Sequence, residues 1–251
     1  MKVEQANLLI DRQGDVTRLT LNRPERGNAL SATLVEELAA AVQACSLDGT
    51  RLLAIEGAGT HFCTGFDLGD LDRESDDSLL ARFVRVELLL QSVHGAPFTT
   101  VALVQGRAMG AGADLLAACE QRWVAPGSSF AYPGAGFGLV LGSARLAQLV
   151  GVAAARDWIA SGRAVRAEEA LASGLASRLV APPERAAALA TLAERARRLD
   201  VPTQAAVQAA TQGGHAMAEA ARAAQLAELV RSAARPGLKA RISAYRAASR
   251  R

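Results

Sequence analysis

Apolar and polar positions along this chain follow two periodicities in turn, one typical of strands and one typical of helices. The segments 6–11 and 16–22 have strand character around a Gly14-Asp15 turn, which predicts an N-terminal hairpin. Two continuous apolar runs, 51–56 and 98–105, lack polar alternation and predict strands buried on both faces. The pattern therefore predicts a mixed α/β fold with a buried sheet.

Helical spacing begins after Ser31, which is a suitable N-cap for a helix that reaches about Cys45. Its apolar stripe consists of Leu34, Val35, Leu38, Ala41 and Val42. The remaining elements expected before residue 184 are helices over 79–93, 150–161 and 167–173 and short strands within 121–125 and 174–180. From Glu184 onward the chain has helical periodicity with breaks at Pro202, Gly213-Gly214 and Pro236-Gly237. This pattern predicts a helical appendage.

Two segments are expected to be loops. Residues 72–78 are acidic and polar, which predicts a mobile surface loop that could cover a site. The run 127–142 is rich in glycine, which predicts a loop with unusual backbone angles or a close approach to another segment.

A glycine-rich turn directly after the strand at 98–105 is the strongest chemical signal. Gly110-Ala111-Gly112-Ala113-Asp114 leads into a helical pattern, so backbone amides should gather at a helix N-terminus. Unpaired amides there favour negative charge, either on a phosphate or on a developing oxyanion. Asp114 places one carboxylate beside them.

Composition narrows the class of protein. The 251 residues are 50% hydrophobic, enough for a sizeable core. No apolar run is long enough to cross a membrane, and the first eleven residues lack the pattern of a signal peptide, so we expect a soluble cytoplasmic protein. Cys45, Cys63 and Cys119 are widely spaced and are expected to be buried fillers rather than disulfides or zinc ligands.

A net charge of +3, a sequence pI near 9.0 and 4% aromatic residues give little material for nucleic-acid binding. Positive charge gathers near the C-terminus, at Lys239, Arg241, Arg246, Arg250 and Arg251. A solvated helix face is the favoured interpretation and a contact for an anionic ligand is the alternative. RNA binding through these helices would weaken steeply with salt.

Several familiar motifs are absent. The sequence contains no H-E-x-x-H, no phosphate-binding P-loop and no G-x-S-x-G, and its histidines are scattered, so metal and triad chemistry are not expected. The turn at 110–114 lacks the third glycine of a dinucleotide fingerprint, and the next strand ends in Trp-Val-Ala without an acidic residue for a ribose.

Four motifs in order resemble the enoyl-CoA hydratase/isomerase (crotonase) superfamily. They are Arg23-Pro-x-x-x-Asn28-Ala29-Leu30, G-x-G-x-x-F-x-x-G-x-D-L at 57–68, Gln105-Gly106 with the Gly-Ala-Gly-Ala-Asp turn, and Ser161-Gly162-Arg163-Ala164 to Glu169-Ala170, followed by Gly174-Leu175-Ala176 and Val180. The resemblance spans about residues 8–180. It implies a spiral of ββα units with a C-terminal helical appendage, which we divide at 1–195 and 196–251.

The resemblance implies an acyl-CoA substrate and no separate cofactor. Its thioester oxygen would lie in an oxyanion hole formed by the backbone amides of Phe66 and Ala111, which would stabilise an enolate. The expected contacts to CoA are Arg26, Ala29, Thr64, Gly65, Asp67, Leu68 and Gly110. Asp67 is also expected to cap its turn.

Hydratases of this family use two glutamates. Asp114 stands where the first is expected, and Gly134, after Phe130-Ala131-Tyr132-Pro133, stands where the second is expected. An aspartate is one methylene shorter, so about 1 Å of reach is lost, a misplacement that can cost about a hundredfold in rate. Asp114 could simply cap a helix, but the motif favours an acid/base role. Tyr132 and Ser143 are possible substitutes for the missing acid, although packing or capping is the simpler role for each.

We therefore predict an acyl-CoA enzyme of the hydratase/isomerase type with Asp114 as acid/base. Isomerisation and decarboxylation remain open because each needs fewer acids than hydration. A non-catalytic acyl-CoA-binding or assembly protein that has lost the second glutamate is the competing class. By resemblance, the alanine-rich C-terminal helices would pack between subunits of a homotrimer or a dimer of trimers. No membrane or nucleic-acid partner is expected.

Overall fold

The computed structural model describes residues 6–212 and 214–248, and it confirms the predicted α/β class. The strands are β1 (Leu8–Gln13), β2 (Val16–Leu21), β3 (Leu52–Gly57), β4 (Thr99–Val104), β5 (Arg107–Met109), β6 (Gln121–Val124), β7 (Ser129–Ala131), β8 (Val165–Arg166) and β9 (Arg178–Leu179). The α-helices are α1 (Ala32–Cys45), α2 (Asp76–His94), α3 (Ala111–Ala118), α4 (Ser143–Val150), α5 (Val152–Ser161), α6 (Ala167–Ser173), α7 (Arg185–Ala196), α8 (Val201–Thr211), α9 (Gly214–Ala233) and α10 (Leu238–Ala248). Short 3-10 turns are η1 (Pro24–Arg26), η2 (Leu71–Arg73), η3 (Pro133–Phe137) and η4 (Pro182–Glu184).

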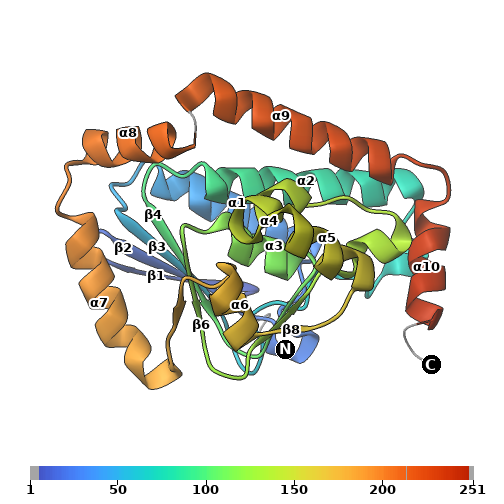
Figure 1. The fold of residues 1–251 in the computed structure, drawn as a ribbon, viewed down its shortest axis with the longest axis horizontal. Helices are drawn as coiled ribbons and strands as arrows, with labels where there is room; N and C mark the ends of the chain where they lie inside the picture. The colour runs from blue at the N-terminus through green and yellow to red at the C-terminus, as the bar shows by residue number, and fades with distance from the viewer. Residues whose placement is uncertain (1–5, 213, 249–251) are drawn as a thin grey trace.

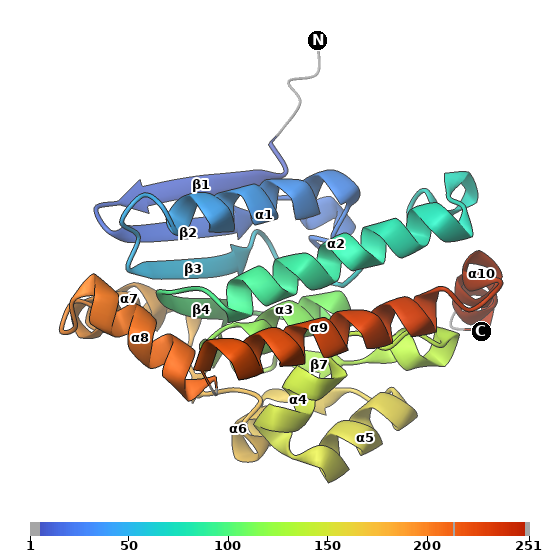
Figure 2. The same cartoon turned by 90° about the horizontal axis from the view of Figure 1, so that it is seen from above.

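Six strands form the main sheet in the order β1-β2-β3-β4-β6-β9. Figure 2 shows the first four of them, β1 to β4, side by side. The predicted hairpin is present as the antiparallel pair β1 and β2, and the pairs from β2 to β9 are parallel. A smaller sheet has the order β5-β7-β8. Helices follow strands in sequence, which is why parallel neighbours are possible.

The central strands β3 and β4 are buried on both faces, as the apolar runs predict. Leu53 and Ile55 of β3 pack into the cluster that includes α1, α2 and α3. Leu52 and Ala54 point the other way, into a second cluster that includes α7. This two-sided burial explains why the sequence of β3 shows no polar alternation.

Ser31 caps α1 as predicted, since its side chain accepts a hydrogen bond from the amide of Leu34. The predicted stripe on this helix is buried. All three cysteines are free and buried, as expected. These elements were predicted well because their apolar spacing and cap are local.

Some boundaries differ from prediction. Residues 76–78 belong to the first turn of α2, because Ser75 and Ser78 form a reciprocal capping box, so only part of 72–78 is a loop. Residues 127–142 contain β7 and η3 as well as loop. The helix predicted over 150–161 begins after Gly151, and α4 precedes it. Pro202 lies in the first turn of α8, where its missing amide is harmless, so the break comes before it.

The last two helices return to the body of the same chain. α9 runs alongside α2, and α10 crosses the end of α2 near η3 (Figures 1 and 2). Their buried side chains form one cluster with residues from α2 and the loop around 139: Leu71, Leu79, Phe83, Leu139, Leu229, Ala233, Leu238 and Ile242. The helical appendage thus contributes to the wall of the pocket described next.

Candidate active site

Two loops that leave adjacent strands run side by side and form the floor of a pocket. The amide of Phe62, after β3, donates to the carbonyl of Gln105, after β4, at 2.9 Å. Further along, the amide of Met109 donates to the carbonyl of Cys63 at 3.0 Å. The parallel pairing of β3 and β4 therefore continues into the loops that carry the two predicted oxyanion segments.

Glycines allow these loops to approach closely. Gly65 has φ +100°, and a Cβ there would lie 2.7 Å from the carbonyl oxygen of Met109. A Cβ on Gly112, at the start of α3, would overlap the carbonyl oxygen of Cys63. The glycine residues seen in the sequence are thus required by backbone contact between the two segments.

The amides of Phe66 and Ala111 have no backbone acceptor within the described parts of the chain. Ala111 is the first residue of α3, so its amide has no partner inside the helix. Its nitrogen lies 3.7 Å from the position that a Cβ on Gly65 would occupy. Phe66 and Ala111 both line the same pocket.

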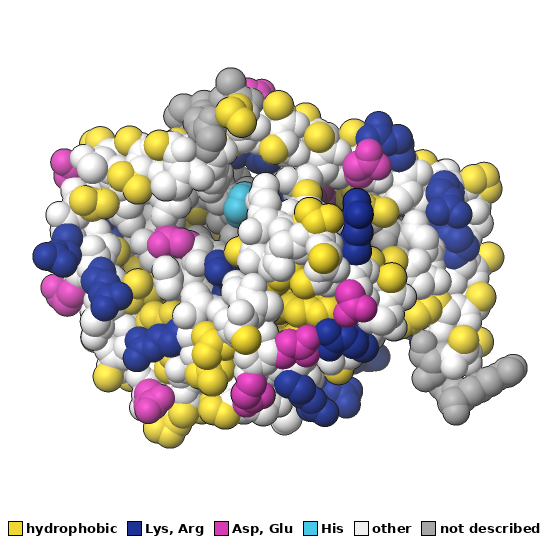
Figure 3. Space-filling model, in the orientation of Figure 1, with side chains coloured by type: hydrophobic (Ala, Val, Ile, Leu, Met, Phe, Trp, Pro, Cys, Tyr) yellow, Lys and Arg dark blue, Asp and Glu magenta, His cyan; other side chains and the backbone are white. Residues whose placement is uncertain are grey.

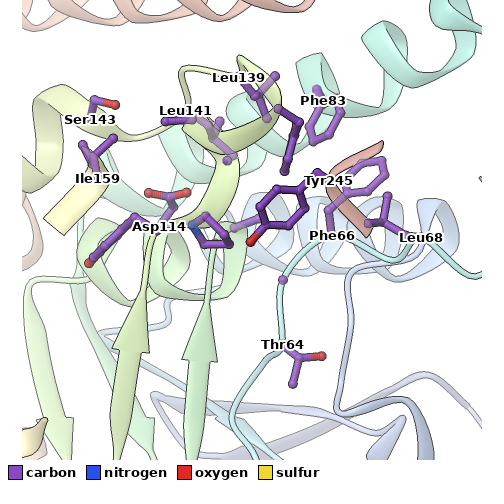
Figure 4. A pocket seen from close by; sticks show the side chains of 18 residues that line it. Thr64, Phe66, Leu68, Phe83, Asp114, Leu139, Leu141, Ser143, Ile159 and Tyr245 are labelled. Atoms are coloured by element: carbon purple, nitrogen blue, oxygen red, sulfur yellow. The ribbon is translucent and has the colours of Figure 1, made fainter. Parts of the chain in front are cut away.

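The pocket encloses about 230 Å³ and is mainly apolar. Its lining consists of Thr64, Gly65, Phe66, Leu68, Phe83, Gly110, Ala111, Asp114, Tyr132, Pro133, Gly134, Ala135, Phe137, Leu139, Leu141, Ser143, Ile159 and Tyr245. Figure 4 shows Asp114 on one side with Leu141, Ser143 and Ile159, and Phe66, Leu68 and Phe83 on the other. Asp114 is the single carboxylate among these residues.

Asp114 lies in the first turn of α3 and is only 3% exposed. Its Oδ1 atom is buried and has no hydrogen-bond partner among the described residues. Burial raises the pKa of Asp114 to about 8, with Arg145 opposing the shift and Glu87 adding to it. No capping bond from this carboxyl group is found among the described residues, so nothing in this geometry supports the interpretation of Asp114 as a helix cap.

The surroundings of Asp114 come from distant segments. Gly142, the N-cap of α4 with φ +64°, lies so close that a Cβ there would overlap Asp114 Oδ1. The hydroxyl of Tyr132 is buried without a partner among the described residues, and burial raises the Tyr132 pKa well above its ordinary value. Ser143 lines the pocket as well.

Gly134 lines the pocket where the second acid was sought. The nearest atom to a Cβ placed on it would be the carbonyl oxygen of Leu139 at 3.6 Å, an ordinary contact distance. The backbone therefore leaves room for a side chain at Gly134. The second acid is therefore absent because residue 134 is a glycine, and not because the loop leaves no space for a side chain.

An aromatic wall forms one side of the pocket. The rings of Phe66 and Phe83 stack with centroids 4.1 Å apart, and the Arg82 guanidinium lies 4.2 Å from the centroid of Phe66. Arg82 also donates to the carbonyl of Asp67 at 3.0 Å. Tyr245 of α10 meets Phe137 edge to face at 5.5 Å. Phe83 and Arg82 therefore both contact the ring of Phe66.

The predicted CoA contacts fall into two groups. Thr64, Gly65, Leu68 and Gly110 line the pocket, whereas Arg26, Ala29 and Asp67 do not. Arg26 is exposed at the surface, and Ala29 is buried with its carbonyl accepting from Arg23.

Asp67 has the turn-capping contact that was expected of it. Asp67 Oδ1 accepts from the amide of Gly69 at 2.9 Å, and Oδ2 pairs with Arg23 at 2.8 Å. One oxygen is therefore engaged within the turn, and the other pairs with the distant segment that carries Arg23.

Several lining residues were not predicted. Phe83, Phe137, Leu139, Leu141, Ile159 and Tyr245 reach the pocket from α2, η3, the following loop, α5 and α10. Each looks like an ordinary apolar or aromatic position in its own segment. No local pattern could distinguish them, because tertiary packing alone brings them together.

The basic residues of α10 are not a simple solvated face. Lys239 Nζ donates to the carbonyls of Asp72 and Glu74, Arg241 donates to the carbonyl of Phe137, and Arg246 to that of Leu68. These bonds tie α10 to the loops around the pocket. Arg250 and Arg251 lie outside the described residues.

On the face shown in Figure 3, cationic and anionic side chains are intermixed.

The described residues contain no group of three His, Cys, Asp or Glu side chains that could hold a metal ion. None of the helices in the described ranges combines the length and hydropathy that a membrane span needs.

Fold and site together define an α/β protein in which residues of two strand-end loops and one carboxylate line an apolar pocket. The enoyl-CoA hydratase/isomerase family model matches residues 11–239, and the chain belongs to that family. Its fold is the crotonase fold, as predicted.

Individual relatives and solved structures similar to this chain carry descriptions from the same family. A solved structure described as a putative enoyl-CoA hydratase/isomerase from Bordetella parapertussis is 42% identical, has a TM-score of 0.92, and aligns over 96% of this chain and 98% of its own. A probable enoyl-CoA hydratase of Mycobacterium tuberculosis is 37% identical over 168 residues, which is 65% of this chain and 67% of that protein. An enoyl-CoA hydratase structure from Bacillus halodurans shares the fold at 23% identity, with a TM-score of 0.84 over 95% of this chain and 100% of its own.

Proposed function

We propose that this chain is an acyl-CoA enzyme that moves a double bond through a thioester enolate, with Asp114 carrying the proton. The observation that supports this most strongly is the single buried carboxylate beside two free amides in an apolar pocket. Membership of the family supports an acyl-CoA substrate, and the residues of this pocket favour isomerisation over hydration.

The amides of Phe66 and Ala111 would hold the thioester oxygen. Backbone donors that already lack an acceptor need no rearrangement when negative charge develops on that oxygen. Loss of one such donor in other enzymes costs about 3 to 4 kcal/mol. The close contact through Gly65 and Gly112 supports this role, because it fixes both donors on one rigid floor.

Asp114 would act first as a base and then as an acid. As a carboxylate it takes a proton from C2 of a 3-enoyl thioester, and the electron pair moves toward the thioester oxygen. The protonated Asp114 then returns the proton to C4, which leaves the double bond between C2 and C3. A pKa of about 8 suits a group that must both accept and release a proton near neutral pH.

One carboxylate suffices for this shuttle, whereas hydration also requires a water held and activated at C3. The other polar side chains of the lining are Thr64, Tyr132, Ser143 and Tyr245, all neutral hydroxyl groups. The remaining walls are apolar and suit an acyl chain. The reaction as proposed consumes no further cofactor, and Thr64, Gly65, Leu68 and Gly110 would contact the substrate near its thioester.

A comparison of two thioesters tests the proposal. With 3-hexenoyl-CoA we expect absorbance of the conjugated enoyl thioester to rise, and with crotonyl-CoA we expect little loss of that absorbance. Asp114→Asn should lower the isomerisation rate by about 10² to 10⁴-fold, the usual contribution of a general acid or base. Faster consumption of crotonyl-CoA than of 3-hexenoyl-CoA would contradict isomerisation.

Calorimetry with the product thioester addresses the competing class. If the chain binds enoyl-CoA but turns over neither substrate at any chain length, the non-catalytic acyl-CoA-binding function is correct and the enzymatic proposal fails.

Gly134→Glu tests whether the missing second acid is what limits hydration. The space around Gly134 admits a Cβ, so the variant should fold and place a second carboxyl group at the pocket. We expect crotonyl-CoA hydration to rise at least about tenfold over the parent, with Gly134→Gln as the uncharged control. Equal hydration by the two variants would show that the carboxyl group is not the missing element.

A further inference from the structure

A buried ion pair lies behind Asp114, outside the lining of the pocket. Arg145 of α4 and Glu87 of α2 are 2% and 1% exposed. Their side chains meet in a two-bond fork, with Nη1 to Oε1 at 2.9 Å and Nη2 to Oε2 at 2.6 Å. An ion pair this deeply buried is costly to desolvate, and a pair of apolar side chains could fill the same volume. Its presence therefore calls for a role beyond packing.

The pair joins three helices. Gln225 of α9 accepts a second bond from Arg145 Nη1 at 2.7 Å. Gln91 of α2 donates to Glu87 Oε1 at 2.8 Å and to the carbonyl of Arg222 on α9 at 3.0 Å. The helix α9, from the C-terminal part of the chain, is thus bonded to α2 and α4 at this point.

The N-terminus of α4 is the point at which this network meets the site. Gly142, its N-cap, lies against the Asp114 carboxyl group, and Arg145 is three residues further along the same helix. α3, which carries Asp114, packs against α4. A displacement of α4 would move Gly142 and Ser143 relative to the carboxyl group.

The two charges of the pair act on Asp114 in opposite senses. Arg145 favours the ionised carboxyl group and Glu87 disfavours it. Two further titratable groups are coupled to these charges. The charge of Asp114 affects the pKa of Tyr132, and the charges of Arg145, Arg222 and Glu87 affect the pKa of His94. Because the pair is neutral as a whole, burial remains the main influence on Asp114.

We propose that Glu87 and Arg145 are positioning residues that hold the start of α4 against Asp114 and offset each other's charge behind it. The effect on catalysis rests on the proposed function, whereas the effect on Asp114 itself does not.

The proposal predicts shifts of opposite sign for the two halves of the pair. Glu87→Gln keeps the shape and leaves Arg145 uncompensated, so Asp114 should titrate about one pH unit lower. Arg145→Met leaves Glu87 uncompensated, so Asp114 should titrate about one pH unit higher. The double variant should titrate close to the parent. Gln225→Leu removes one hydrogen bond of Arg145 without a change of charge, and it is the matched control that should not shift the titration.

The titration is measured by ¹³C NMR of aspartate-labelled protein without substrate, with the Asp114 signal assigned by its loss in Asp114→Asn. Shifts in the same direction for both single variants, or an unshifted Glu87→Gln, would overturn the proposal. If Arg145→Met fails to fold, the titration of Glu87→Gln, compared with that of the Gln225→Leu control, still tests the proposal. The pH profile of kcat/KM should move with the NMR titration; shifted NMR titrations without any turnover would leave the inference standing and refute the proposed function.

Discussion

At the scale of single residues, the site depends on a carboxyl group kept in an apolar environment. Asp114 has an unpartnered buried oxygen and a pKa raised by burial to about 8. Above about pH 4 such a group lowers the free energy of unfolding, because the unfolded chain releases this proton near pH 4 whereas burial keeps it on the folded chain up to about pH 8. Catalytic usefulness and stability therefore oppose each other at this position.

Asp114→Asn should relieve that cost in a pH-dependent way. Between about pH 4 and pH 8 the folded parent binds a proton that the unfolded chain has released, so parent stability falls as pH rises across this window. The variant lacks this proton. We expect the difference in free energy of unfolding, variant minus parent, to grow from pH 4 to pH 8 in chemical denaturation. The exposed Asp70→Asn is the control, and parallel curves for Asp114→Asn and its parent would contradict the burial of the charge.

The location of this residue could be predicted from sequence, but its environment could not. A glycine-rich turn after a buried strand indicated free amides and a nearby acid, since those features lie within one short segment. Burial raises the pKa of Asp114, and the apolar residues that line the same pocket come from remote segments, including Leu141 and Ile159. Neither residue carries a local sign of its role.

At the scale of elements, the start of α4 controls the geometry around Asp114. Gly142→Ala would force a Cβ into Asp114 Oδ1 and place a non-glycine residue at φ +64°. Gly151, the N-cap of α5, has φ +82° and open space around its Cβ position. Both glycines have a positive φ that strains any other residue, but only at Gly142 would an added Cβ overlap another side chain.

We therefore expect Gly142→Ala to lower the isomerisation rate by about 100-fold, the scale of a misplacement near 1 Å, and Gly151→Ala to keep most of it. Both should lose similar stability from the backbone strain, measured as Tm. Equal activity of the two variants would show that contact with α4 does not position Asp114.

The sequence predicted the elements with strong local signals and missed those without them. α1 has a serine cap and a continuous apolar stripe, so its start and face were predicted. α4 is short and begins at a glycine with no side-chain cap, so nothing local separated it from the preceding glycine-rich loop. The start of α2 could have been found, because Ser75 and Ser78 have the spacing of a capping box.

At the scale of the whole molecule, the C-terminal helices complete the pocket of their own chain. Ile242 of α10 is fully buried in the cluster with Phe83 and Leu139, and Tyr245 lines the pocket. Asp76 at the start of α2 accepts bonds from the amides of Gly237 and Lys239, at 2.9 and 2.8 Å. This packing joins residues far apart in sequence, so the periodicity of α10 predicted a helix but not its partner.

Ile242→Asp should release α10, because it buries a charge without a partner. We expect faster hydrogen exchange over residues 238–248 and a KM for enoyl-CoA raised about tenfold or more, with the ββα core intact by circular dichroism. Ala244→Asp, at an exposed position on the same helix, is the control. An unchanged KM in Ile242→Asp would mean that α10 does not contribute to substrate binding.

Self-association is a separate prediction for the whole molecule. The resemblance implies a homotrimer or a dimer of trimers, and sedimentation equilibrium of the full chain measures this directly. A mass three or six times that of the chain is expected, and a monomer at micromolar concentration would contradict the prediction. The division of the chain at residue 195 also stays a prediction.

The central claim is that Asp114 is the proton carrier of a one-carboxylate site. It is tested most directly by the pH dependence of kcat/KM for isomerisation of 3-hexenoyl-CoA. Because the free enzyme must start with Asp114 ionised, kcat/KM should rise through an apparent pKa near 8 and level off above it, and the limb should vanish in Asp114→Asn. A limb that falls through this range, or one that persists in Asp114→Asn, would contradict the account.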